Sequence, residues 1–318
     1  MSDIPVISIV TPSYNQGEFL EETLVSVLSQ EGDFELDYLV IDGGSSDASP
    51  ELIKSYAERL EAGDWPVRCR GIRYRWVSEP DRGQTAALLK GFAMAEGGIL
   101  AWLNSDDVYL PGVLQTAIDR FQADPETALL YGEAQYCDTE GEIIGNYPTE
   151  EFNLEKLAWF NFFCQPATFF RKEVYAAVGG LDANLHYGMD YDLFVRIGKR
   201  YRCSLCREVL AKYRLHESSK TVDSMELYKN HEETLSLAVK HFDWAPLNRV
   251  YGASYYACLS RLPEFLIRRQ LPLILLSSLY AVPRSLWLNR GVRRADLRLL
   301  NRKTLSKLFK DRLDILRG

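Results

Sequence analysis

Residues 5–30 read PVISIVTPSYNQGEFLEETLVSVLSQ and residues 37–42 read DYLVID, and these two stretches decide the fold. Both contain a short apolar run rich in β-branched or aromatic residues, which is typical of a buried strand. Between the runs, apolar residues recur at helical spacing at Phe19, Leu20, Leu24, Val27 and Leu28. This order predicts a strand, a helix and a second strand parallel to the first.

The same alternation continues as far as about residue 110. Strands are predicted at residues 72–77 and 99–103, and helices at residues 49–60 and 84–95. The sequence therefore predicts an α/β fold with a mainly parallel, Rossmann-like sheet that is covered by helices on both faces.

The pattern changes in the rest of the chain. Strands at residues 128–137 and 167–170 are mixed with helices near Lys172 and over residues 190–200. Beyond His216 the sequence is predicted to be helical to its end.

Charge is distributed unevenly along the 318 residues. The net charge is −7, but residues 249–318 contain 15 Lys and Arg against 4 Asp and Glu. Nucleic-acid binding needs an electropositive face over the body of a protein, so a nucleic-acid partner is not expected. The basic carboxyl-terminal segment suits an anionic membrane surface instead.

The amino terminus and the cysteines indicate the compartment. Residues 1–10, MSDIPVISIV, have neither a basic region nor a small-residue cleavage site, so no signal peptide is expected. Six cysteines without regular spacing predict reduced thiols, and the zinc-like spacing of Cys203 and Cys206 lacks a second pair. We expect a cytoplasmic protein, with a peripheral position on the inner face of the cell membrane as an option.

A polar cluster follows each of the first four predicted strands. The clusters are TPSYN (11–15), DGGSSD (42–47), SEPDRGQ (78–84) and NSDD (104–107). Because ligands bind at the carboxyl ends of strands in open α/β sheets, the four clusters are expected to converge on one crevice.

Asp106 and Asp107 carry the strongest chemical signal. These adjacent carboxylates follow a predicted buried strand and precede a turn at Pro111 and Gly112. Mg²⁺ and Mn²⁺ that serve phosphates commonly take only one or two protein carboxylates. The pair fits a divalent-metal site, and it equally fits a cap that complements the dipole of the next helix.

Three further positions have both a chemical and a structural interpretation. Asp42 can accept hydrogen bonds from a base or ribose, or it can form a turn. Asp190 can remove a proton from an acceptor hydroxyl or cap its helix, whereas Asp192 is placed for an i,i+4 ion pair with Arg196. His216 can bind a metal or a diphosphate, although a lone histidine is more often structural.

The ordered motifs closely resemble the family-2 glycosyltransferases over residues 5–220. The resemblance rests on VISIVTPSYNQGEFLEETLVSVLSQ (6–30), YLVIDGGSSDAS (38–49), SEPDRGQTAALLKGF (78–92) and LNSDDVYLPGVL (103–114). FCQPATFFRKEVYAAVGGLD (163–182) and MDYDLFVRIGKRY (189–201) look like the acceptor-side segment and the catalytic-base helix of that family. The resemblance implies a GT-A fold, a nucleotide-sugar donor and an inverting reaction.

The resemblance also implies roles for individual residues. Asp107 would be the principal ligand of Mn²⁺ or Mg²⁺, and His216 would contact the metal or the diphosphate. Asp190 would be the catalytic general base, although Met189 stands where the family usually has a glutamate. The residues matched to nucleotide-sugar binding are Thr11, Pro12, Tyr14, Asp42, Asp81, Gln84, Asn104 and Asp106.

The implied organisation is a GT-A catalytic domain followed by a helical, basic extension. The catalytic domain is expected over residues 1–220, with a nucleotide-sugar half at about 1–110 and an acceptor half at about 111–220. The extension covers residues 221–318. Its apolar run LPLILLSSLYAVPRSLWL (271–288) contains a proline and an arginine, which argues against a transmembrane helix. Docking on anionic lipid and packing against protein both remain open.

The expected reaction moves a sugar from a nucleotide-diphosphate sugar to an acceptor hydroxyl, with metal assistance and inversion by a single displacement. A carbohydrate or lipid-linked acceptor in cell-envelope polysaccharide or glycolipid assembly is the expected partner. One alternative is an inactive nucleotide- or carbohydrate-binding protein on the same fold, which should have lost Asp107 or Asp190. A nucleotidyltransferase should carry an early glycine-rich basic loop, and none lies between Thr11 and Gly17.

Overall fold

A computed structural model describes residues 4–216, 224–263 and 270–291. The chain divides into two compact units, Met1–Leu154 with Phe162–Leu215 and Glu155–Asn161 with His216–Gly318. The predicted domain boundary at residue 220 lies outside the described residues.

The first unit is built on a nine-stranded sheet with the order β3-β2-β1-β4-β8-β6-β9-β5, and β7 pairs with β6. The strands are β1 (Val6–Ser13), β2 (Glu35–Asp42), β3 (Gly71–Ser78), β4 (Ile99–Trp102), β5 (Val108–Tyr109), β6 (Thr127–Cys137), β7 (Ile143–Asn146), β8 (Thr168–Arg171) and β9 (Arg202–Arg214). The first four strands pair in parallel. β8 pairs antiparallel with β4 and β6, whereas β6 and β9 are parallel.

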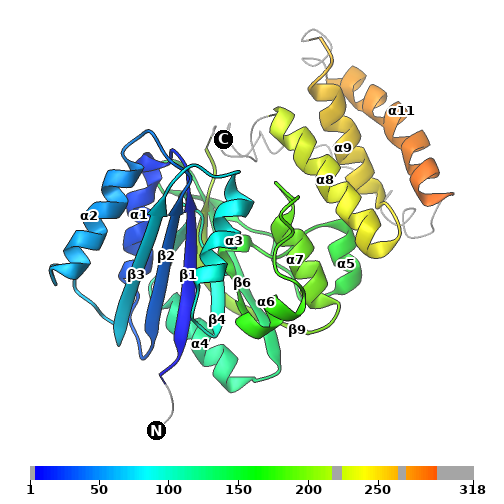
Figure 1. Cartoon of the computed structure of the whole chain (residues 1–318). Coiled ribbons are helices and arrows are strands. Elements are labelled where there is room, and N and C mark those ends of the chain that lie inside the picture. Colours follow the sequence, from blue (N-terminus) through cyan, green and yellow to red (C-terminus); the bar gives the residue numbers. More distant parts are fainter. Residues whose placement is uncertain (1–3, 217–223, 264–269, 292–318) are drawn as a thin grey trace. The chain divides into compact units, whose positions relative to one another are not determined.

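Helices cover both faces of this sheet (Figure 1). They are α1 (Gly17–Leu28), α2 (Ser49–Glu61), α3 (Gln84–Met94), α4 (Val113–Ala123), α6 (Lys172–Ala177) and α7 (Met189–Gly198). One apolar core joins α1, α2 and α4 to the sheet through residues such as Leu24, Ile53 and Leu114. An aromatic cluster joins α3 and α7 to the strands, with the ring of Trp102 between those of Phe92 and Phe194.

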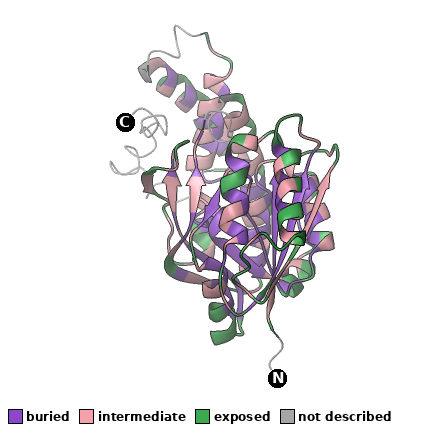
Figure 2. Cartoon of the chain, turned by 90° about the vertical axis from the view of Figure 1, so that its left-hand side faces the viewer, coloured by how far each residue is buried: buried purple, intermediate pink, exposed green. Residues whose placement is uncertain are grey.

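Burial explains why the opening sequence forms this sheet. β1 and β2 are buried over almost their whole length, as expected for parallel strands with helices on both faces (Figure 2). The predicted α/β fold is confirmed, and the predicted strands and helices of residues 5–103 lie within a few residues of those observed. The short strands β5 and β7 carry too little pattern to be predicted.

The second unit is helical in its described residues. It contains α8 (Ser224–Phe242), α9 (Leu247–Leu259) and α11 (Gln270–Asn289), together with most of α5 (Leu154–Trp159). A small apolar core includes Leu235, Val250 and Ala281. No helix in residues 4–216, 224–263 or 270–291 has both the length and the apolar character needed to cross a membrane. All six cysteines are free thiols, as predicted.

A glycine sets the distance between α3 and β1. A Cβ atom added to Gly91 would lie 2.4 Å from Val10 Cγ1, so only a glycine allows the helix to approach this closely. The approach matters for the site because the first turn of α3 carries Gln84 and Thr85.

We expect Gly91→Ala to lower the free energy of unfolding by about 1–3 kcal/mol, because overpacking outweighs the better helix propensity of alanine. Urea denaturation measures this change. The double variant Gly91→Ala/Val10→Ala should lose less than the sum of its two single variants. Gly71→Ala is the control, since a Cβ atom there meets no other atom within 4 Å. Strict additivity would contradict the proposed contact.

Candidate functional site

The carboxyl ends of β1, β2 and β3 lie side by side. The pairing register places Ser13 next to Asp42 and Asp42 next to Ser78. Asp42 is fully buried, and one of its carboxylate oxygens accepts hydrogen bonds from the backbone N–H groups of Gly44 and Ser45 and from the Ser78 hydroxyl. Asp42 therefore holds the loop after β2 in place, and its predicted contact with a base stays a prediction.

A second set of hydrogen bonds ties the loop after β1 to the loop after β2. Asn15 adopts a left-handed backbone conformation with φ of 51°. Its side-chain oxygen accepts a hydrogen bond of 2.9 Å from the backbone N–H of Ser46, and its own N–H donates to the Ser45 hydroxyl at 2.8 Å. The backbone N–H of Gly17 donates to Asp47 at 2.8 Å. The two loops thus form one structure.

The predicted nucleotide contacts on β1 differ in exposure. Thr11 and Pro12 are buried, and the Thr11 hydroxyl lies 3.0 Å from the hydroxyl of Tyr38. Tyr14 has 62% of its surface exposed. Of these three side chains, that of Tyr14 is the one presented to solvent.

The loop after β3 adds Asp81 and Gln84. Asp81 accepts a hydrogen bond of 2.7 Å from the backbone N–H of Gly83. A Cβ atom on Gly43 would lie only 3.2 Å from Asp81 Oδ1, so the loops after β2 and β3 touch. Gln84 donates to Asn104 Oδ1 at 2.7 Å, which connects this loop to the one after β4.

Asn104 makes side-chain hydrogen bonds with three other residues of the site. Its amide nitrogen donates to Asp107 Oδ2 at 3.1 Å and to Gln165 Oε1 at 3.0 Å. Gln165 in turn donates to the carbonyl of Trp102 at 2.7 Å. The sequence did not single out Gln165, because a lone glutamine after an apolar segment has no distinctive pattern.

The two adjacent carboxylates have different environments. Asp107 is fully buried, and its Oδ1 accepts a hydrogen bond of 3.1 Å from the backbone N–H of Arg214. Burial, followed by the charge of Asp106, raises the pKa of Asp107 well above its ordinary value, and hydrogen bonds from Arg214 and Asn104 oppose that rise. Asp106 is only partly buried. Of the two residues, Asp106 is therefore the more exposed.

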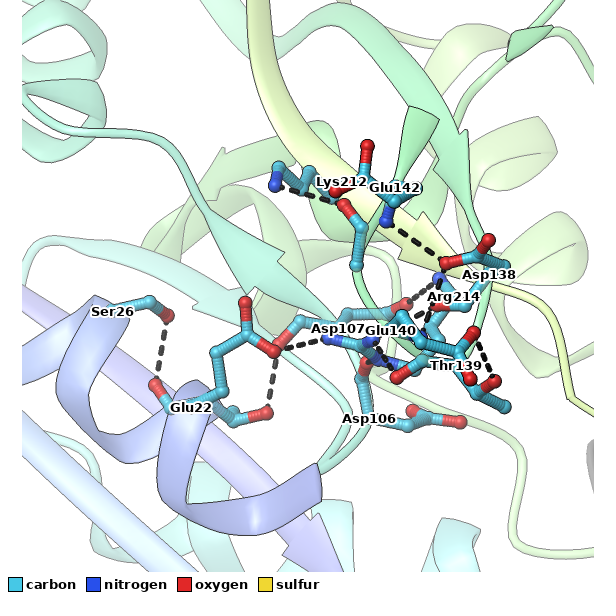
Figure 3. A network of polar contacts seen from close by, with 12 residues as sticks. Glu22, Ser26, Asp106, Asp107, Asp138, Thr139, Glu140, Glu142, Lys212 and Arg214 are labelled. Carbon is cyan, nitrogen blue, oxygen red and sulfur yellow. Dashed lines mark hydrogen bonds and ion pairs between the residues drawn. The ribbon is translucent and has the colours of Figure 1, made fainter. Parts of the chain in front are cut away.

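Arg214 is a second residue that sequence reasoning missed. Its guanidinium is buried and donates to the carbonyls of Asp106, Asp138 and Thr139 at 2.9–3.0 Å, and it forms an ion pair with Glu22 (Figure 3). It also lies over the ring of Phe19, 5.1 Å from the ring centroid. Because arginine is rarely buried, a single arginine at the end of a strand gave no signal for this role.

Asp190 occupies the first turn of α7, and the start of α3 supports that turn. The Thr85 hydroxyl donates to the carbonyl of Leu185 and lies 2.9 Å from the sulfur of Met189. Burial raises the pKa of the Cys164 thiol, and the charges of Asp107 and Asp190 raise it further.

The predicted ion pair in α7 and the predicted metal contact of His216 have different outcomes. The ion pair between Asp192 and Arg196 is confirmed, with a distance of 2.7 Å. His216 is buried and belongs to the second unit, so its metal contact stays a prediction. Within the described part of the chain, no three His, Cys, Asp or Glu side chains are grouped as a metal-binding cluster.

Comparisons with known proteins agree with this geometry. A family model described as glycosyl transferase family 2 matches residues 8–179. Chondroitin synthase of Escherichia coli is 23% identical over 260 residues, which are 80% of this chain but only 36% of that protein. This chain therefore spans little more than a third of that relative.

Two solved structures share the fold at 15% identity each. TarS of S. aureus in complex with UDP-GlcNAc has a TM-score of 0.54 and covers 80% of this chain and 73% of its own. The mannosyltransferase PcManGT of Pyrobaculum calidifontis, in complex with GDP-Man and Mn²⁺, has a TM-score of 0.57 and covers 99% and 88%.

We expect Arg214→Met to lower the free energy of unfolding by about 3–5 kcal/mol, because it leaves buried carbonyls without a donor and Glu22 without its partner. The control is Arg120→Met, since the ion pair of Arg120 with Glu208 is about half exposed on both sides. The control should change the unfolding free energy by no more than about 0.5 kcal/mol. Chemical denaturation of both variants measures the difference, and equal losses would contradict the role given to Arg214.

Proposed function

The chain belongs to glycosyl transferase family 2, and on that premise we propose that it transfers a sugar from a nucleotide-diphosphate sugar to an acceptor hydroxyl with inversion. It is a glycosyltransferase with a GT-A fold. The single observation that carries the proposal is the series of hydrogen bonds from Gln84 to Asn104 and from Asn104 to Asp107. Thr85, the residue after Gln84, contacts Met189 at the start of α7, the helix that carries Asp190.

The donor would occupy the edge formed by the loops after the first four parallel strands. Tyr14 is the most exposed of its predicted contacts and would lie near the nucleotide together with Asp81, which is partly exposed. Thr11, Pro12 and Asp42 would form the inner wall of the pocket, because all three are buried and the side chains of Thr11 and Asp42 make hydrogen bonds within the protein. UDP-GlcNAc and GDP-Man in the two structural neighbours support a nucleotide-sugar donor.

A divalent cation fits the pair Asp106 and Asp107. We assign the roles of the two residues differently from the sequence prediction, which made Asp107 the principal metal ligand. Both oxygens of Asp107 already accept hydrogen bonds inside the protein, whereas Asp106 is partly exposed. We therefore assign the metal-facing oxygen to Asp106 and a positioning role to Asp107. A bound Mn²⁺ or Mg²⁺ would stabilise the negative charge of the leaving diphosphate, and His216 stays a candidate for a further contact.

Asp190 would accept the proton of the acceptor hydroxyl. The first turn of α7, which carries Asp190, is held by the contact of Met189 with Thr85, and this would keep the base in place before the acceptor arrives. A base on one side of the anomeric carbon and a leaving diphosphate on the other give a single displacement with inversion. No covalent glycosyl enzyme is needed.

The biological setting is also part of the proposal. The similarity to a chondroitin synthase supports a carbohydrate or lipid-linked acceptor in polysaccharide or glycolipid assembly. The basic residues after Arg249 support work at the inner face of the cell membrane, in the cytoplasm. An inactive binding protein on this fold is the alternative, and it would bind a donor without ever cleaving it.

Calorimetric titration with UDP and GDP, with and without Mn²⁺, tests the donor site. One nucleotide should bind more tightly with Mn²⁺, and Asp106→Asn should remove that gain, which we expect to be about tenfold or 1.4 kcal/mol. Asp107→Asn should instead lower the melting temperature, because one of the two buried oxygens that accept hydrogen bonds is replaced by an NH₂ group. Asp119→Asn on the exposed face of α4 is the control. If Asp107→Asn alone removed the Mn²⁺ effect, the metal-facing role would return to Asp107.

Release of the nucleoside diphosphate from UDP-GlcNAc or GDP-Man, to an acceptor or to water, tests the base. We expect Asp190→Asn to slow release by about 10²–10⁴-fold with little change in nucleotide affinity, because a general base acts only in the chemical step. Glu173→Gln on exposed α6 is the control. Unchanged release in Asp190→Asn would remove this residue from the mechanism, and no release from the wild type would favour the inactive alternative.

A further inference from the structure

In the described part of the second unit, helix α11 has one buried face and one exposed apolar face. Leu273, Ser277, Ala281 and Ser285 are buried, and α11 packs along α9. The other face, called here the α11 face, consists of Leu275, Leu276, Leu279, Tyr280, Val282, Leu286 and Trp287. At about 100° per residue these side chains occupy a continuous arc of about 160°.

The α11 face concentrates apolar surface in one place. Seven of the twelve large hydrophobic side chains that are exposed in the described part of the chain lie on this single helix. Leu279 is 71% exposed and Trp287 is 79% exposed. Scattered apolar side chains are normal on a protein surface, but a contiguous patch marks a surface that meets something apolar.

Charge decides between the candidate occupants. Residues 270–289 contain no Asp or Glu, and residues 264–318 contain 13 Lys and Arg against 4 Asp and Glu. Two copies of this basic stretch of sequence would repel one another, which disfavours a second copy of the chain as the occupant. A bilayer with anionic headgroups offers the opposite charge next to an apolar interior.

The side chains of the α11 face also match a membrane interface. Tyr280 and Trp287 are the amphipathic aromatic residues that favour the headgroup level, and the aliphatic residues between them suit the acyl boundary. Because α11 packs along its length against α9, the opposite side of the helix would lie parallel to the membrane plane.

We propose that the α11 face docks the protein on an anionic lipid bilayer, with Leu279 and Trp287 inserted at the headgroup boundary and the basic residues that flank α11 in the sequence drawn to the lipid charge. This proposal rests on the membrane setting of the proposed function and names the surface that makes the contact. Docking would bring the enzyme to lipid-linked acceptors without using any residue of the donor site.

Vesicle sedimentation of the full chain tests the proposal. The probes are vesicles of phosphatidylcholine alone and vesicles in which about a third of the lipid is phosphatidylglycerol. Wild type should bind the anionic vesicles, and Leu279→Gln/Trp287→Gln should lower the partition coefficient about tenfold. The matched control is Val67→Gln/Ile143→Gln, which removes two exposed apolar side chains from the first unit. It should bind as wild type does.

Three outcomes would overturn the proposal. In the first, wild type binds neither kind of vesicle. In the second, wild type and the α11 variant bind vesicles equally and have the same oligomeric state. In the third, the two bind equally, but light scattering shows a dimer for wild type and a monomer for the variant. The last outcome would assign the face to a second copy. Nucleotide titration of the same variants in solution should be unchanged, so a failure of the donor site is distinguishable from a failure of docking.

Discussion

The hydrogen bonding of Asp107 and Arg214 holds together the segments from which the candidate site is made. The backbone N–H of Arg214 donates to the carboxylate of Asp107, and its guanidinium binds the carbonyl of Asp106 and the carboxylate of Glu22. Taking these charges out of water costs free energy, which dense hydrogen bonding offsets. In return, the loop after β4 has a defined conformation before any ligand arrives, and such preorganisation is what transition-state stabilisation requires.

The acidic residues of the site divide by burial into two kinds. Asp42 and Asp107 are fully buried and are engaged by donors from their own and neighbouring loops. Asp106 and Asp190 are partly exposed, the first just before β5 and the second in the first turn of α7. We therefore propose chemical roles for the second kind, whereas the hydrogen bonds of the first kind fix the shape of the loops.

The first hundred residues could be predicted well because their signal is local. Apolar periodicity places β1, α1 and β2 correctly. A local signal also succeeds later in the chain, where the i,i+4 spacing of Asp192 and Arg196 predicts an ion pair that the structure contains. Arg214 and Gln165 could not be predicted, since their partners lie far away in the sequence and neither residue type marks a role by itself. For the same reason the sequence located the acidic pair but not the difference in burial between its two members.

The distance along the chain between Asp107 and Arg214 has a consequence for synthesis. β9 is the last strand of the sheet to be made, and it supplies the N–H group that the buried carboxylate needs. Contacts between distant residues form late because the intervening loop must first be closed. An emerging chain can assemble β1 to β4 early, yet the ends of those strands stay incomplete until β9 has left the ribosome. Synthesis of β9 therefore completes the hydrogen bonding of the buried carboxylate.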